Sequence, residues 1–567
     1  MYTKISSCGT DGRMESAMTH ECVTGRREFL RYAAGSAAWL AASGALLDSF
    51  AGEVRAASLK SSEPDLILAL TASRSETQLL SGKPTGVWRF SARVLKGDGA
   101  SVQPSPGGYL GPTLRLKKGQ RVRIEFNNQL ADPAIVHWHG LHLPEAMDGH
   151  PRYAVGPGKR YVYEFQVINR AGSYWYHPHT HGITGRQIYM GLAGMLLVSD
   201  EEEQGLRLPQ GESDLPIVLQ DRTFGRDNQL AYISEEGDGG RAGSGMMGGG
   251  GVMGGGMMGR GMMGGSIRGG MMGMMSEMMG FLGDEIFVNG RRDAVFPVAS
   301  RAYRLRLLNA SNSRIYRLAW GDGTPLTIIA TDGGLLERPE RRAAVTLAPG
   351  ERIDLFADFS DRSVGATLAM RSLAFENPMG GMMGGMMRQG KLPSGAAFDV
   401  FRIRVDRRDG RSARLPERLS ALPPPKEEET VNFGSPRPFR LTMGMMRWGI
   451  NGRTFDMDGV ADDEIVKLGT SEVWEFANDT SRMMAMPHSM HLHGAQFRVL
   501  DRTSSGRQTE LRESIVDAGL KDTVLVLPGE RVKILAPFSR YAGLFPYHCH
   551  MLEHGDAGMM RNYSVRA

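Results

Sequence analysis

Apolar and polar side chains alternate in many short runs along the chain. Clear examples are RVRIEFNN at 121–128, KRYVYEFQV at 159–167 and YRLRLLN at 303–309. Because successive side chains of a strand point to opposite faces of a sheet, this alternation predicts strands with one buried face. Gly, Pro and Asn separate the runs, as they do in turns between strands. The pattern predicts an all-β protein built from β-sandwiches.

Two of these strand motifs occur three times in the same order. One motif is a strand that ends in asparagine, and its copies end at Asn127, Asn309 and Asn478. The other is a turn followed by a strand, and its copies contain Pro157, Pro349 and Pro528. Equivalent positions lie 169 to 192 residues apart. The repeats therefore predict three consecutive copies of one sandwich.

The repeats, and the composition between them, also predict the domain boundaries. We expect the first sandwich at residues 58–207, the second at 208–406 and the third at 436–567. The proline-rich, charged stretch at 407–435 is typical of a linker. A Met/Gly-rich insert at 245–280 interrupts the second sandwich.

The N-terminus has the features of an export signal. Arg26 and Arg27 in GRREFLR precede an apolar run at 32–51, which small residues close. This pattern is typical of a twin-arginine signal peptide, here residues 1–57, and predicts export to the bacterial periplasm. The alternative, a membrane anchor, is disfavoured because the apolar run is short and is interrupted by glycine and polar residues.

The charge balance excludes one class of function. The 67 Lys and Arg residues nearly match the 62 Asp and Glu residues, giving a formal net charge of +5, and the two signs are interleaved along the chain. Because no basic patch results, we expect no nucleic-acid binding. We also expect no stable membrane anchor and a monomeric protein.

One cysteine stands in an unusual position. The cysteines are Cys8, Cys22 and Cys549, and removal of the signal would leave Cys549 alone, between His548 and His550. A lone cysteine in an oxidising compartment forms no internal disulfide, so its presence calls for chemistry or burial. In a strand, the two flanking histidines would face one side and the cysteine the other.

Histidines are concentrated in four short windows. The windows are HWHG (137–140), WYHPHTHG (175–182), HSMHLHG (488–494) and YHCHMLEH (547–554). The first and third windows begin ten residues after the repeated asparagine, and the histidines of the other two begin twenty residues after the repeated proline. The middle copy has Ala319 and Ala369 at these places. A site shared by the two outer sandwiches explains this distribution.

The residue types in these windows are typical of copper ligands. On the cysteine side, His488, Cys549, His554 and Met559 supply two imidazoles, a thiolate and a thioether, the ligand set of a blue-copper electron-transfer centre. On the other side, four His-x-His pairs could hold three copper ions with open positions for oxygen. They are His137, His139, His177, His179, His491, His493, His548 and His550.

A structural zinc site or an ordinary polar core would fit these histidines less well than copper does. A structural zinc takes four ligands, commonly with several cysteines, and satisfied core histidines would not gather at repeat-equivalent positions. A two-copper nitrite reductase is also conceivable on such sandwiches, but three copies and eight cluster histidines argue against it.

The windows resemble those of a known family. HWHG, WYHPHTHGITGRQIYMGLAG, MPHSMHLHGAQFRVL and HCHMLEHGDAGMM are similar to the copper motifs of the three-domain multicopper oxidases, with most likeness to the bacterial periplasmic cuprous oxidase and laccase-like branch. The resemblance implies three consecutive cupredoxin-like Greek-key β-sandwich domains. It also implies four copper ions, one of type 1, one of type 2 and a type 3 pair.

The resemblance assigns ligands to each copper. The type 1 copper would take His488, Cys549 and His554, with Met559 as the axial ligand. The type 2 copper would take His137 and His491. The type 3 pair would take the remaining six cluster histidines, His139, His177, His179, His493, His548 and His550.

Oxygen reduction consumes protons, so an acid near the cluster is expected. Asp148 in AMDGHP stands where the family carries such an acid, although a turn aspartate is the alternative. Close relatives often have a second, proton-feeding glutamate directly after the type 1 histidine. Here that position is Gly555, and Asp556 or Glu553 could take over the role.

Many of the 36 methionines lie in glycine-rich tracts, at 246–279 and 379–387, that keep neither helical nor strand periodicity. Thioether sulfur favours Cu(I), so these tracts could collect additional Cu(I). The expected function is oxidation of Cu(I) to Cu(II) in copper detoxification, coupled to four-electron reduction of O2 to water. The alternatives are a laccase-like oxidase of phenolic or other organic reductants, and a periplasmic copper-sequestering protein with little turnover.

Overall fold

The computed structural model describes a large part of the chain. The described residues are 63–105, 108–233, 278–377, 391–409, 412–422, 424, 427–444, 447–479 and 486–567. The predicted signal peptide and the methionine tracts, except for Met278 and Met279, lie outside them. Among the described residues we find no helix with the length and hydropathy that a bilayer crossing requires.

The first domain has two sheets. One has the strand order β2-β1-β5-β7 and the other β3-β4-β9-β8-β6. The strands are β1 (Leu66–Thr77), β2 (Thr85–Lys96), β3 (Val102–Gln103), β4 (Thr113–Lys117), β5 (Arg121–Asn128), β6 (Val136–His139), β7 (Arg160–Gln166), β8 (Gly172–Pro178) and β9 (Gly194–Ser199). Two short helices, α2 (Thr184–Tyr189) and α3 (Glu201–Gly205), flank β9.

The second domain also has two sheets, with the orders β12-β11-β10-β14-β19-β16-β17 and β13-β21-β20-β15-β18. Its strands are β10 (Asp214–Arg222), β11 (Glu285–Val288), β12 (Arg291–Arg292), β13 (Val295–Ala299), β14 (Ala302–Asn309), β15 (Tyr316–Trp320), β16 (Leu326–Thr331), β17 (Gly334–Arg342), β18 (Val345–Leu347), β19 (Arg352–Asp358), β20 (Thr367–Ser372) and β21 (Phe398–Arg407).

The third domain repeats the arrangement, with the orders β23-β22-β25-β29-β27 and β24-β31-β30-β26-β28. Its strands are β22 (Arg437–Gly444), β23 (Arg447–Ile450), β24 (Ile465–Lys467), β25 (Thr470–Ala477), β26 (His488–Leu492), β27 (Arg498–Ser504), β28 (Thr523–Val526), β29 (Glu530–Phe538), β30 (Gly543–Cys549) and β31 (Met560–Arg566). The helices are α5 (Thr509–Glu513) and α6 (Leu552–Asp556).

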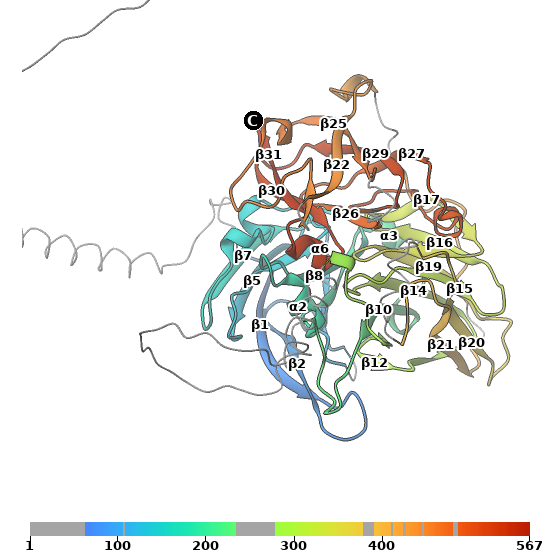
Figure 1. Ribbon diagram of the computed structural model, residues 1–567. Coiled ribbons are helices and arrows are strands. Elements are labelled where there is room, and N and C mark those ends of the chain that lie inside the picture. Colours follow the sequence, from blue (N-terminus) through green and yellow to red (C-terminus); the bar gives the residue numbers. More distant parts are fainter. Residues whose placement is uncertain are drawn as a thin grey trace, which may run out of the picture. The chain divides into compact units, whose positions relative to one another are not determined.

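Short 3-10 turns complete the described elements: η1 (Gly99–Ser101), η2 (Glu145–Met147), η3 (Pro151–Tyr153), η4 (Gly211–Ser213), η5 (Glu427–Glu429) and η6 (Asp462–Glu464). No described sheet mixes strands from different thirds of the chain, as the colours in Figure 1 show. Each third also has its own apolar core. The prediction of three consecutive cupredoxin-like β-sandwiches is therefore confirmed.

The alternating runs form strands, but the faces that carry the polar residues are partly exposed in some strands and fully buried in others. In β5, buried and half-buried residues alternate, as the sequence predicts for a one-sided strand. All eight residues of β14 are buried, however, including Arg304 and Arg306. These two arginines pair with Asp354 and Asp214, so ion pairs replace the solvent on that face. A buried charge is tolerated only when it is paired in this way.

Candidate functional site

The histidines of the first domain lie on neighbouring strands. His137 and His139 are on β6, His177 is on β8, and His179 directly follows β8. The two strands are antiparallel, and His137 lies directly opposite His177. Since side chains two apart in a strand share a face, the four side chains are brought to one region of the sheet.

The third domain repeats this arrangement on β26 and β30. His491 lies directly opposite His548 in the antiparallel register. His493 and His550 directly follow the two strands. The middle domain has Ala319 and Ala369, on β15 and β20, at the two positions that the repeat spacing gives, so neither position carries a metal ligand.

The strand register corrects one detail of the predicted repeat. The repeat spacing matched His137 with His488, because both lie ten residues after the repeated asparagine. In the structure, His137 corresponds to His491, since each is the histidine paired across the sheet with its neighbour, His177 or His548. The third domain has three more residues between the repeated asparagine and this histidine.

Histidines of the two outer domains meet in one buried group, which we call the histidine cluster. His137 Nε2 lies 3.3 Å from His491 Nε2. His548 Nε2 lies 3.1 Å from His179 Nε2 and 3.2 Å from His493 Nε2. All eight predicted cluster histidines are buried. The cluster consists of His137, His139, His177, His179, His491, His493, His548 and His550.

In four cluster histidines, Nδ1 lies within hydrogen-bond distance of a backbone carbonyl oxygen. His137 Nδ1 lies 2.6 Å from the Asp148 carbonyl, and His491 Nδ1 lies 2.8 Å from the Asp522 carbonyl. A carbonyl accepts a hydrogen bond, so these rings carry their proton on Nδ1 and present a lone pair on Nε2 to the cluster. His177 Nδ1 and His548 Nδ1 are held in the same way by backbone carbonyls.

His139 is turned the other way. Its Nε2 lies 3.0 Å from Asp522 Oδ1 and 3.2 Å from Thr523 Oγ1, while its Nδ1 faces His177 Nε2 at 3.4 Å. The carboxylate of Asp522 accepts a hydrogen bond from Nε2, which leaves the Nδ1 lone pair directed into the cluster. The orientation of this ring is therefore set by a residue of the third domain.

The cluster fits metal ions better than it fits an ordinary polar core. Burial lowers the pKa of His177 to about 3 and that of His548 to about 4, so both rings are neutral at neutral pH. Both ring nitrogens of His550 are buried and have no hydrogen-bond partner among the described residues. Lone pairs that face one another without a proton between them are costly unless a cation is bound. Imidazole groups suit copper.

The residues predicted for the cysteine side also lie close together. Cys549, at the end of β30, directly follows the cluster residue His548. Cys549 Sγ lies 3.6 Å from His488 Nδ1 and 3.7 Å from His554 Nδ1, and these two nitrogens are 3.2 Å apart. Met559 is fully buried in the same core and its carbonyl accepts a hydrogen bond from the Cys549 amide. We call these four residues the cysteine site.

The thiol of the cysteine site is free and protonated without a metal. Cys549 forms no disulfide and is fully buried. Burial raises the pKa of Cys549 to about 12. A bound cation is what would deprotonate the thiol, because metal binding to cysteine releases its proton. The two histidines and the sulfur together match the donor set of a His2Cys copper centre.

Asp148 lies against the histidine cluster, after η2. Its Oδ2 lies 2.7 Å from His493 Nδ1, and its carbonyl oxygen contacts His137. The side chain is 1 % exposed, and burial raises the pKa of Asp148 well above the ordinary range. Asp148 Oδ1 has no hydrogen-bond partner among the described residues, so one oxygen of a buried carboxyl group remains available beside the cluster.

Glu553 and Asp556 on α6 have other partners. Glu553 accepts hydrogen bonds from Tyr232, Phe281, Asn312 and Ser313. Asp556 accepts hydrogen bonds from the Thr184 and Gly185 amides at the start of α2. Within the described part of the chain, neither carboxylate contacts a cluster histidine. Both hold α6, and with it His554, against the other two domains.

Sequence reasoning missed the residues that surround both sites. Trp448 on β23 has its ring centroid 4.8 Å from those of both His488 and His554, and its Nε1 donates a 2.8 Å hydrogen bond to the Met278 carbonyl. Asp522, which holds His139, is the other missed residue. Neither belongs to a repeated motif. Trp448 lies far before His488 in the chain, and nothing in the sequence next to Asp522 marks it as a partner of His139.

Comparisons with known proteins agree with this geometry. The multicopper oxidase family matches residues 91–203 and again residues 430–567. The chain is 30% identical over 507 residues to a laccase of Bacillus stratosphericus, covering 81% of this chain and 89% of the laccase. It is 28% identical over 474 residues to the multicopper oxidase mco of Staphylococcus aureus, covering 83% and 85% of the two chains.

A solved structure shows the same likeness. The McoA multicopper oxidase of the hyperthermophile Aquifex aeolicus aligns with a TM-score of 0.68 and 31% identity, covering 89% of this chain and 97% of that one. Fold, histidine cluster, cysteine site and sequence similarity all agree. The chain belongs to the multicopper oxidase family.

Proposed function

We propose that this multicopper oxidase oxidises Cu(I) to Cu(II) and uses the electrons to reduce O2 to water. Four Cu(I) ions each give one electron, and one O2 takes up these four electrons and four protons to form two water molecules. The observation that carries the proposal is the contact between the end of the first methionine tract and the cysteine site. Met278 is buried, and its backbone carbonyl accepts a hydrogen bond from Nε1 of Trp448, whose ring packs on His488 and His554.

Other methionines support the same proposal. Met279 packs against the core of the third domain, although its tract lies within the second domain. Met443 also packs against this core, and Met486 and Met551 are buried in it. Because thioether sulfur favours Cu(I), methionines that lead to the cysteine site would direct this ion to the place where its electron is taken up.

We assign four copper ions to the two sites. His488, Cys549, His554 and Met559 would hold the type 1 copper, and His137 and His491 would hold the type 2 copper. The other six cluster histidines, His139, His177, His179, His493, His548 and His550, would hold the type 3 pair. When bound, the copper ions supply one-electron redox chemistry and the place where oxygen binds. Cys549 is covalently joined to His548 and His550, so one peptide link on each side connects the two sites.

In this proposal Asp148 holds a proton beside the cluster. Burial raises the pKa of this carboxyl group and so favours the protonated form that a general acid needs. Its contact with His493 also orients that ring. Export to the periplasm through the twin-arginine signal is part of the proposal, and the N-terminal mass of the mature protein is the direct check.

We expect Asp148→Asn to lower the rate of oxygen uptake by about 100-fold while copper content is unchanged, because the amide keeps the size of the side chain but cannot give up a proton. The measurement is oxygen consumption against pH, with copper counted per chain. Asp556→Asn is the control, since it removes a half-buried carboxylate that contacts α2 instead of the cluster. An equal loss in both variants would refute the role of Asp148.

Replacing the methionines of residues 246–275 by leucine should reduce oxygen uptake with Cu(I) by about 10-fold and leave uptake with a phenol unchanged. Leucine keeps the apolar bulk and removes the thioether, so this variant separates capture of Cu(I) from steric shielding. Met278 and Met279 lie outside the replaced segment and keep their contacts with the third domain. A second variant, which deletes residues 246–275, controls for access of bulky substrates.

A laccase-like activity is the second candidate, favoured by the likeness to the laccase of Bacillus stratosphericus. It predicts that oxygen uptake with the phenol is equal to or faster than uptake with Cu(I), and that Cu(I) itself drives little uptake. It also predicts that uptake with the phenol rises when the tract is deleted. Copper storage predicts more than four copper ions per chain and negligible oxygen uptake. The same oxygen and copper measurements therefore separate all three functions.

A further inference from the structure

Arg352 joins all three domains at the edge of the histidine cluster. It is the first residue of β19, in the second domain, and it is fully buried. Its guanidinium group donates to three backbone carbonyls, those of Ser173, Gly350 and Asp332, and to both carboxylate oxygens of Asp522. An arginine side chain has five N–H donors. All five are therefore used, in one geometry.

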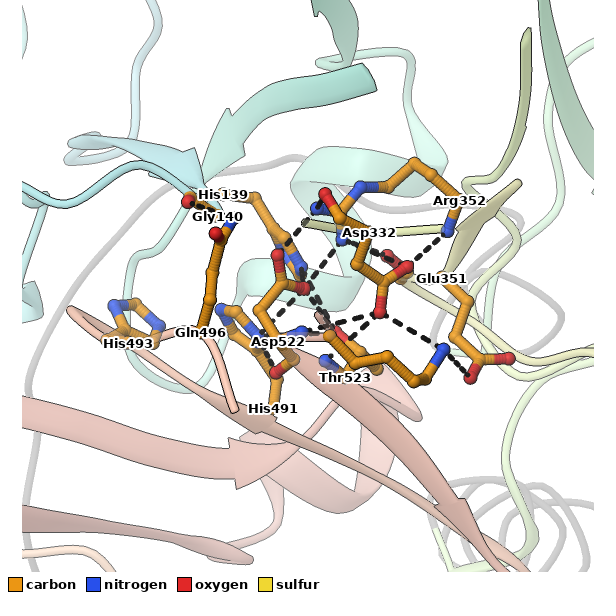
Figure 2. Close-up of polar contacts among 12 residues, drawn as sticks. His139, Gly140, Asp332, Glu351, Arg352, His491, His493, Gln496, Asp522 and Thr523 are labelled. Carbon is orange, nitrogen blue, oxygen red and sulfur yellow. Dashed lines mark hydrogen bonds and ion pairs between the residues drawn. The ribbon is translucent and has the colours of Figure 1, made fainter. Parts of the chain in front are cut away.

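Asp522 transmits this geometry to the cluster. Arg352 Nη1 and Nη2 lie 2.6 and 2.5 Å from its two oxygens, a bidentate arrangement that fixes the carboxylate plane. The same Oδ1 accepts from His139 Nε2 at 3.0 Å, as Figure 2 shows. The ring that presents Nδ1 to the cluster is thus held by a carboxylate that is itself held by the second domain.

Lys521 neutralises the neighbouring carboxylates. Its Nζ lies 3.3 Å from Asp332 and 3.0 Å from Glu351. Asp332 Oδ1 also accepts from the Arg352 backbone amide at 2.8 Å (Figure 2). Because Lys521 pairs with the other two acids, Arg352 is left as the bidentate partner of Asp522. Burial by itself would lower the pKa of Arg352, but Asp522 and Asp332 outweigh burial and hold that pKa above its ordinary value.

The backbone at Gly140 lies directly against the ion pair of Arg352 and Asp522. A Cβ added to Gly140, which has a φ of +90°, would lie 2.5 Å from Asp522 Oδ2 and 2.8 Å from Arg352 Nη2. Gly140 follows His139 directly. The ion pair is therefore packed onto the backbone of the very strand end that carries the histidine.

The turn before Arg352 touches the cluster at another histidine. A Cβ on Gly350, with a φ of +86°, would lie 2.9 Å from the ring of His550. The carbonyl of Pro349 accepts a 2.7 Å hydrogen bond from Ser489, on the strand between His488 and His491. This turn is the second-domain copy of the repeated turn-strand motif. The domain without predicted ligands has the same turn and packs it against the third domain.

We propose that Arg352 is a positioning residue for the copper-binding histidine cluster, acting through Asp522 on His139. The proposal rests on the ligand assignment above. In it, the middle domain supplies no ligand but completes the support of the cluster, so that the ligand geometry depends on all three domains being docked. Partners that orient a metal-ligating histidine typically change metal affinity by roughly 10- to 100-fold.

The test uses the full copper-loaded chain and three variants. Arg352→Met removes the guanidinium group at similar length, and Arg352→Lys keeps the charge but not the bidentate fork. Arg304→Met is the matched control: Arg304 is an equally buried arginine on β14 that pairs with Asp354 and contacts no described cluster histidine. Chelator competition gives the copper affinity of the cluster. Near-ultraviolet absorption reports the type 3 pair, the electron paramagnetic resonance signal reports type 2 copper, and the blue colour reports the cysteine site.

We expect Arg352→Met to weaken copper binding at the cluster by roughly 10- to 100-fold and to lose most of the type 3 absorption while the blue colour stays. Arg352→Lys should recover part of the loss, and Arg304→Met should keep both signals. Equal signals in Arg352→Met and wild type, or equal losses in Arg304→Met, would overturn the proposal. If Arg352→Met does not fold, Arg352→Lys serves as the test. The proposal predicts a lower ratio of type 3 absorption to blue absorption than in wild type, and an equal ratio would overturn it. A wild-type protein without cluster copper would instead overturn the ligand assignment itself.

Discussion

Replacing Cys549 with serine should abolish the blue colour and the oxidase turnover of the copper-loaded protein and leave the fold intact. A serine hydroxyl is similar in size to the thiol and can donate a hydrogen bond to His488 Nδ1 or His554 Nδ1, which lie 3.6 and 3.7 Å from the sulfur. It cannot replace a thiolate ligand of copper, because its oxygen stays protonated and is a hard donor. Electrons from the substrate would then have no entry.

The measurements are visible absorption, oxygen uptake and thermal unfolding of the variant and the wild type. The histidine cluster is the internal control, because its copper content should be unchanged when only the sulfur is removed. Turnover that persists in Cys549→Ser, with copper still at the cluster, would overturn the assignment of Cys549 as the electron entry.

The copper-free protein should lose stability steeply as the pH falls below about 6.5. In the fold the pKa of His177 and of His554 is lowered to about 3 and that of His548 to about 4, chiefly by burial. An unfolded histidine has a pKa near 6.5, so below this pH the unfolded chain binds more protons than the folded chain. The stability is therefore full above about pH 7 and is lost as the pH falls toward the folded values.

At pH 5 each of these three histidines should lower the free energy of unfolding by roughly 2 kcal/mol, and the three together by roughly 6 kcal/mol. Urea unfolding of chelator-treated protein at pH 7.5 and pH 5 measures the difference. His177→Gln should make the difference smaller by roughly 2 kcal/mol, because glutamine does not titrate. A copper-free protein equally stable at both pH values would show that these rings are not buried and neutral.

The sequence alone was sufficient for the three-sandwich fold and for the grouping of candidate ligands. Alternation in RVRIEFNN corresponds to β5, because the side-chain period of a strand is a local property of the backbone. The repeated motifs identified three copies, and the alternation around Cys549 separated it from His548 and His550. These inferences needed only residues close in the chain, or equivalent positions in the three copies.

The tertiary structure decided which residues support those ligands. The polar face of β14 is buried in ion pairs, and His137 corresponds to His491 instead of His488. Asp522 holds His139, and the end of a second-domain tract reaches Trp448 in the third domain. Each of these contacts joins residues that are far apart in sequence and belong to different strands or domains. No local pattern encodes such a contact, because it exists only once the strands have paired and the domains have packed together.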